Sequence, residues 1–132
     1  MMVVVDASAL VNALAFDGTE GERARELLSG EHAWAAPEHM PVEVFSAVRG
    51  FCLGGKITEE RARGILEDLA EHMEIELIGV RRLFPLMWEL RGRVTGYDAA
   101  YAASARMFDC PLFTGDARLA KAAEGYCQVT LL

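Results

Sequence analysis

Short apolar strands that alternate with helical segments are the feature that most constrains how this chain can fold. Residues 2–5 and 111–114 are apolar runs of the kind found in buried strands, and 32–37, 75–80 and 127–132 are strand-like stretches. The segments between them have the apolar spacing of amphipathic helices, often with capping residues or glycine at their ends. This order predicts a three-layer α/β/α fold with a mostly parallel central sheet flanked by helices.

The composition is that of one globular domain. The chain has 132 residues, 52% of them hydrophobic, and no linker, repeat or low-complexity tract, so we expect a single domain over residues 1–132. No apolar run approaches the ~20 residues of a membrane span, and the first residues lack the basic region of a signal peptide. The three cysteines match no disulfide or zinc spacing. We therefore expect a cytoplasmic protein without membrane association.

The charge balance limits the ligands of the chain. With 13 basic and 20 acidic residues, the net charge is −7, which argues against nucleic-acid binding through a broad basic surface. Such a role would require a metal ion or a local basic patch. The sequence also lacks a glycine-rich phosphate loop, the nucleophile elbow of serine hydrolases and the ligand spacing of zinc sites.

Two aspartates follow two of the expected strands. Asp6 ends "VVVD", and Asp116 ends "LFTGD". Binding sites of parallel sheets lie beyond the carboxyl ends of the strands, so both aspartates are expected at one edge of the sheet. Each alone equally suits the N-cap of a helix. Capping, however, does not require the two side chains to converge.

Two further acids stand near helix starts. Glu43 lies among apolar residues in "MPVEVFSAV", and Asp98 precedes a run of alanines in "TGYDAAYAASA" that would let its helix pack closely. Either acid could simply favour the helix dipole. If all four acids converge, two carboxylates 4 Å apart repel by roughly 4 kcal/mol at an effective dielectric of 20. A cation or strongly raised pKa values would then be needed.

Mg²⁺ or Mn²⁺ suits such a set of oxygen ligands. A metal ion held there would activate water and neutralise a phosphodiester in its transition state. Ser8 and Thr114 each stand two residues from a strand-end aspartate and could orient it through a hydrogen bond. Local capping is an equal alternative for both hydroxyl groups.

Four stretches carry these acids in order. They are "VVVDASAL", "VEVFSAVRG", "LRGRVTGYDAAYAASA" and "CPLFTGDARLA". Together they resemble the motifs of PIN-domain ribonucleases, and more closely those of the VapC toxins of bacterial toxin–antitoxin pairs. The resemblance covers essentially the whole chain. By position it implies that Asp6, Glu43, Asp98 and Asp116 bind the metal, with Asp116 at the position that varies most in the family.

The resemblance implies an endoribonuclease toxin that uses Mg²⁺ or Mn²⁺ and a water nucleophile on single-stranded regions of RNA, often in tRNA or rRNA. It also implies a homodimer and a small VapB-like antitoxin whose tail blocks the active site. Local arginines would meet the phosphates, although each also suits a solvated face or a salt bridge. The candidate RNA contacts are Arg49, Arg93 and Arg118, together with Arg91.

Two positions depart from the pattern of the family. Arg93 stands where related sequences often carry a small polar residue such as asparagine, which could alter RNA contact. Asp109 occupies a turn position that is often glycine, and aspartate tolerates the left-handed conformation such a turn requires. After the expected strand at 75–80, we expect a helix from Pro85 through Arg93.

Two alternatives remain open on the sequence alone. One keeps the fold but makes the protein a nuclease of RNA processing, or one directed at DNA, rather than a toxin. The other is an inactive binding module whose acids are only helix caps. In that case, replacing an acid by its amide would leave the free energy of unfolding nearly unchanged. A metal site instead predicts that the same replacement stabilises the metal-free protein.

Overall fold

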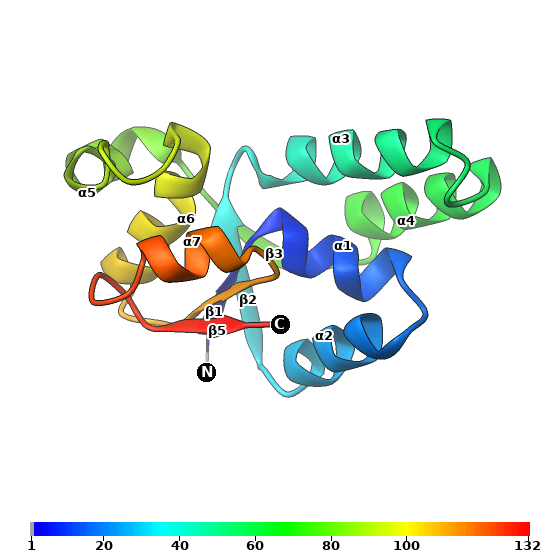
Figure 1. Cartoon of the computed structure of the whole chain (residues 1–132), viewed down its shortest axis with the longest axis horizontal. Helices are drawn as coiled ribbons and strands as arrows, with labels where there is room; N and C mark the ends of the chain where they lie inside the picture. The colour runs from blue at the N-terminus through cyan, green and yellow to red at the C-terminus, as the bar shows by residue number, and fades with distance from the viewer. Residues whose placement is uncertain (1) are drawn as a thin grey trace.

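The computed structural model describes residues 2–132, and in them five strands form one parallel sheet between helical layers (Figure 1). All four strand pairs are parallel, and all five strands lie in the stretches expected from the sequence. The predicted α/β architecture is thereby confirmed. In sheet order the strands are β3 (Ile75–Ile78), β2 (Ala33–Pro37), β1 (Met2–Val5), β4 (Leu112–Thr114) and β5 (Val129–Leu131).

Helices connect successive strands, as parallel pairing requires. Within residues 2–132 none is long and apolar enough to cross a membrane. They are α1 (Ala7–Ala15), α2 (Thr19–Ser29), α3 (Met40–Leu53), α4 (Glu59–Glu71), the 3-10 helix η1 (Val80–Leu83), α5 (Phe84–Glu89), α6 (Gly96–Met107) and α7 (Ala117–Ala122).

Helix α5 is shorter than the sequence predicts. It ends at Glu89, not at Arg93. The amides of Arg93 and Val94 both donate to the Leu90 carbonyl. Gly92, a poor helix former, lies within this turn. The result is a loop of six residues between α5 and α6 that faces α7 across a pocket described below.

Strand β2 contributes side chains to the packing of both helical layers. Ala36 belongs to the larger apolar cluster, which includes side chains of α1, α3 and α4. Its neighbour Ala35 packs instead with Ile78, Ala100 and Ala103 beneath α6. Helices α1 to α4 therefore cover one face of the sheet, while η1, α5 and α6 cover the other (Figure 1).

The chain order reverses between β1 and β4. From central β1 the chain moves outward to β2 and β3, and it then returns on the other side of β1 with β4 and β5. In open parallel sheets, the crevice at the carboxyl ends of the two strands flanking such a reversal is the usual ligand site. Asp6 follows β1 there, and Asp116 follows β4 after a single glycine.

Helix α6 packs close to the sheet because its inward-facing side chains are small. Ala99, Ala100, Ala102 and Ala103 are at most 2% exposed. Their methyl groups let the helix backbone approach the sheet closely, as expected from the sequence. At the other end of α6, Asp109 adopts the left-handed conformation expected of it, with φ +48°.

Enlarging one of these alanines should therefore destabilise the fold. We predict that Ala103→Leu lowers the free energy of unfolding by about 1–3 kcal/mol, because the added carbons have no space beneath α6. The measurement is urea denaturation. Ala70→Leu makes the same change at an exposed position of α4 and should shift the midpoint little. Equal midpoints for the two variants would contradict this account of α6.

Candidate functional site

Asp6 is a buried carboxylate held by three donors. It is 3% exposed and caps α1. Its Oδ1 accepts hydrogen bonds from the Ser8 hydroxyl at 2.7 Å and the Ala9 amide at 2.9 Å, and its Oδ2 accepts one from the Thr114 hydroxyl. A carboxylate offers about four acceptor positions, so one position on Oδ2 remains. Burial raises the pKa of Asp6, the three hydrogen bonds oppose that rise, and the charge of Asp98 adds to it.

The turn after β4 is tied to the same network. The Gly115 amide donates to Ser8 Oγ at 2.9 Å, and the Asp116 amide donates to Thr114 Oγ1 at 3.0 Å. A Cβ atom on Gly115 would lie only 2.5 Å from Nδ2 of Asn12 on α1, so a larger residue here would displace the Asn12 side chain. Both hydroxyl groups donate to the Asp6 carboxylate, whereas Thr114 meets only the backbone amide of Asp116 and not its carboxylate.

Asp116 is itself a helix cap. Its Oδ1 accepts from the amides of Arg118 at 2.9 Å and Leu119 at 3.3 Å at the start of α7. Its Oδ2 accepts no hydrogen bond from residues 2–132. Capping, the alternative left open by the sequence, is therefore real for Asp6 and Asp116 alike. In each case it leaves acceptor capacity on the second oxygen.

Glu43 lies near the start of α3 and is fixed by two aromatic side chains. The hydroxyl of Tyr101, which is 2% exposed, donates to Glu43 Oε1 at 2.5 Å. His39 Nε2 lies 3.2 Å from the same oxygen and pairs with it when the ring is protonated. The His39 ring holds the pKa of Glu43 below its usual value, partial burial opposes this effect, and Tyr101 supports it. Glu43 is therefore ionised at neutral pH.

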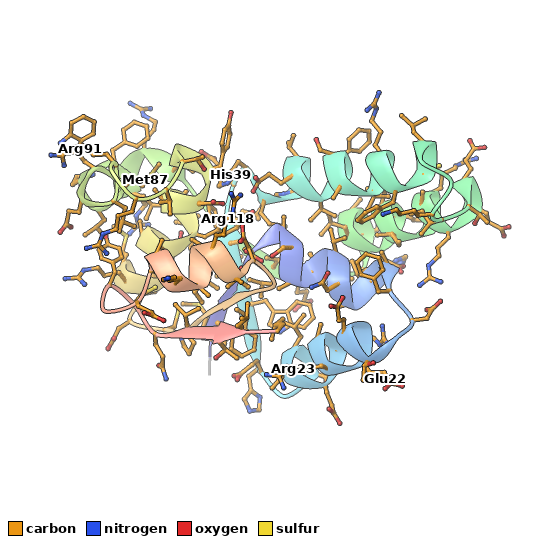
Figure 2. The ribbon with its side chains drawn as sticks, in the orientation of Figure 1. Glu22, Arg23, His39, Met87, Arg91 and Arg118 are labelled. Atoms are coloured by element: carbon orange, nitrogen blue, oxygen red, sulfur yellow. The ribbon has the colours of Figure 1, made fainter. Side chains whose placement is uncertain are left out.

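Asp98 stands in the first turn of α6, which Thr95 caps. Burial raises the pKa of Asp98, and the charges of Asp116 and Glu43 raise it further, while Arg118 and His39 oppose the rise. Figure 2 shows Arg118 on α7 and His39 at the start of α3, the two cationic or polar groups that face this carboxylate. The negative charges of Asp116 and Glu43 therefore both act on Asp98.

The four acids are neighbours through their charges rather than through direct contact. Within residues 2–132, no three His, Cys, Asp or Glu side chains lie close enough together to enclose an ion. Mg²⁺ keeps several of its waters in proteins and takes only one or two carboxylates directly. The oxygen ligands fit such a hydrated ion for two reasons. Asp6 and Asp116 each keep a free acceptor position, and the carboxylates of Asp98, Asp116 and Glu43 outnumber the Arg118 cation beside them.

The structure separates the predicted RNA-contacting arginines. Arg118 lies beside Asp98, and Arg93 lines a pocket that Asp98 borders. Arg49 is exposed on α3 and lies outside that pocket. The sequence reading missed His39 and Tyr101. Helical spacing could have pointed to His39, which precedes Glu43 by four residues, but not to Tyr101, whose partner Glu43 lies on another helix.

The sequence matches the PIN domain family over residues 3–125. The chain belongs to the PIN domain family. This PIN domain is also 41% identical to the ribonuclease VapC1 of Mycobacterium tuberculosis over 129 residues, which cover 98% of this chain and 96% of the relative. The family expected from the four acidic motifs is thereby confirmed.

Solved structures share the fold of this PIN domain. FitAcB from Neisseria gonorrhoeae matches with a TM-score of 0.74 at 14% identity, over 97% of this chain and 96% of that chain. VapBC2 from Rickettsia felis, bound to a DNA fragment from its promoter, matches with a TM-score of 0.69 at 15% identity, over 99% and 98% of the two chains. At such low identity the similarity concerns the fold alone.

The electrostatics of Asp98 lead to a stability prediction. Its raised pKa means that the folded chain holds this proton more firmly than the unfolded chain does. The ionised carboxylate therefore destabilises the fold above its folded pKa. We predict that Asp98→Asn raises the Tm of the metal-free protein at pH 7 by about 1–3 °C, a small shift because the group is half-exposed. The gain should vanish below about pH 3.9, where both states are protonated.

Thermal unfolding in EDTA at several pH values measures this effect. Asp17→Asn is the matched control, because Arg61 lowers the pKa of the Asp17 carboxyl and its loss should give no gain. A Tm for Asp98→Asn that equals the wild-type Tm, or falls below it, at pH 7 would instead support acids that serve only as helix caps.

Proposed function

We propose that this chain is a metal-dependent endoribonuclease and the toxin of a type II toxin–antitoxin system. It hydrolyses phosphodiester bonds in RNA, with tRNA or rRNA as the expected target. The observation that carries the proposal is that Asp6 and Asp116 follow β1 and β4 at the crevice, and that burial and then the charges of Asp116 and Glu43 raise the pKa of Asp98 beside it. The similarity to VapC1 over nearly the full chain supports the same activity.

In this proposal Asp6, Glu43, Asp98 and Asp116 hold Mg²⁺ or Mn²⁺, in part through water. When bound, the ion supplies charge neutralisation and an activated water for attack on phosphorus. Ser8 and Thr114 keep the Asp6 carboxylate in one orientation. The hydrogen bond from Tyr101 does the same for Glu43. Because these partners are themselves buried or backbone-bound, the carboxylates need little rearrangement when the ion binds.

The first test maps new 5′ ends by sequencing after the protein is incubated with total cellular RNA and Mn²⁺ or Mg²⁺. We expect discrete cuts that vanish in EDTA and in Asp6→Asn. Thr114→Val removes one hydrogen bond to Asp6 and should slow cleavage by about 10- to 100-fold. Thr130→Val on β5 is its matched control and should cut at the wild-type rate. Folded wild-type protein, free of partners, that produces no cuts would refute the nuclease proposal.

A small VapB-like antitoxin is part of the proposal. Its support is the family of the chain and the relative VapBC2, a complex bound to DNA from its own promoter. A toxin requires such a partner to restrain it. Co-expression with an antitoxin encoded beside the gene should yield a copurifying complex that produces no cuts. Cleavage that persists in a stable complex would contradict this role.

We also propose a homodimer. Three large aromatic side chains on α5 and at the start of α6 are more than half exposed, namely Phe84, Trp88 and Tyr97. They border two neighbouring pockets of about 370 and 230 Å³ that share Met87 and Gly96. Exposed aromatic patches of this kind are typical of interfaces, and a two-fold pair would cover the same patch on both copies.

Disruption of this aromatic patch should yield monomers. By light scattering we expect a wild-type mass twice the 14.5 kDa of the chain, and a monomer for Trp88→Glu. Leu131→Glu on β5 changes another exposed apolar residue outside the patch and should remain dimeric. A Trp88→Glu protein that keeps the wild-type mass would place the dimer contact elsewhere.

A further inference from the structure

Three arginines converge on one pocket beside Asp98. The pocket has a volume of about 450 Å³ and lies between the α5–α6 loop and α7. Arg91 and Arg93 come from the loop, as does Thr95 at its end; Arg118 comes from α7, and Asp98 borders the pocket from α6. We call it the guanidinium pocket. In a chain with a net charge of −7 and only 13 basic residues, three cations in one pocket form a marked local exception.

Two of these guanidinium groups are already anchored. Arg91 Nη1 donates to the Trp88 carbonyl at 2.9 Å, and its guanidinium carbon lies 4.7 Å from the centroid of the Trp88 ring. Arg93 Nη1 donates to the Ala122 carbonyl at 3.2 Å. Each guanidinium has five N–H donors, so most of them remain for a ligand. An anchored side chain also loses less conformational entropy when a ligand binds.

The pocket has no internal counter-charge apart from Asp98. Within residues 2–132, none of its arginines lies in an ion pair with a carboxylate. Asp98 offsets at most one of the three positive charges. Planar guanidinium groups match the oxygens of phosphate, which they bind through paired hydrogen bonds. The chemistry of the pocket is therefore that of a site for a phosphate ester.

We infer that the guanidinium pocket binds a backbone phosphate of the RNA next to the phosphate that is cut. This inference rests on the proposed function. Asp98 borders the pocket and interacts with the charges of the other acids, so a strand with one phosphate at the acids would bring a neighbouring phosphate to this pocket. Figure 2 shows Arg91 beside α5 at the outer edge of the molecule and Arg118 on α7 nearer its centre, and both line the pocket.

The inference also decides among the candidate arginines. Arg93, where related sequences often carry a small polar residue, becomes one of the residues that bind the RNA backbone. Arg49, which is exposed on α3 away from the pocket, has no such role. An acidic segment of a protein partner is the competing ligand. RNA is favoured because Asp98, one of the acids proposed to act on a phosphodiester, itself borders the pocket.

The test measures cleavage kinetics on a short RNA that contains one mapped cut site. Arg93→Gln and Arg91→Gln should each raise KM by about 10- to 100-fold, the effect of losing a charged hydrogen bond, with kcat nearly unchanged. The slope of log KM against log salt should fall by about 0.7 for each lost phosphate contact. Arg63→Gln, exposed on α4, is the matched control and should behave as wild type. Mn²⁺ affinity by calorimetry should be the same in all four proteins.

A modified substrate identifies the phosphate. A neutral methylphosphonate next to the cut site should raise the KM of the wild type by the same factor and have little further effect on Arg93→Gln. If wild-type protein cuts but both pocket variants match Arg63→Gln, the inference fails while the proposed function stands. If the variants lose only antitoxin affinity, the pocket belongs to the protein partner and the inference fails. If wild type cuts no RNA, the proposed function fails, and the inference with it.

Discussion

The buried hydrogen bonds around Asp6 hold the rest of the site in place. They join the end of β1 to the end of β4, two strands that are far apart in the sequence, through the hydroxyl groups of Ser8 and Thr114. An unpaired carboxylate at this depth would be costly, so the meeting of the two strand ends stabilises the fold. The same contacts that close the sheet thus fix the first acid of the site and the turn that leads to the last one.

Much of the fold could be predicted because each strand carries its own local signal. The β-branched run before Asp6 and the short apolar run before Gly115 are readable as buried strands, and parallel topology then places both aspartates at one edge. The incorrect prediction of where α5 ends also had a local cause. Gly92 could be read as tolerated within a helix, but the turn at Leu90 stopped the helix earlier. Propensity alone does not decide between these outcomes.

The supporting residues of the site were less accessible to sequence reasoning. His39 and Tyr101 have helical spacing from acids, yet the contact that matters joins Tyr101 on α6 to Glu43 on α3. No spacing rule reports that two helices from different parts of the chain meet. The guanidinium pocket has the same origin, since it joins a loop before α6 to α7. The sequence showed the arginines, but only the packing of these elements separates Arg93 from Arg49.

The alanines beneath α6 have a consequence for how the site could be tuned. A methyl group has no alternative rotamer. A change in the distance between α6 and the sheet therefore moves Asp98, in the first turn of the helix, by a similar amount. A slightly larger residue on the hidden side of α6 would lift the carboxylate without altering any group that meets substrate. Graded weakening of the proposed activity should therefore be sought on the buried face of α6, away from the exposed groups of the site.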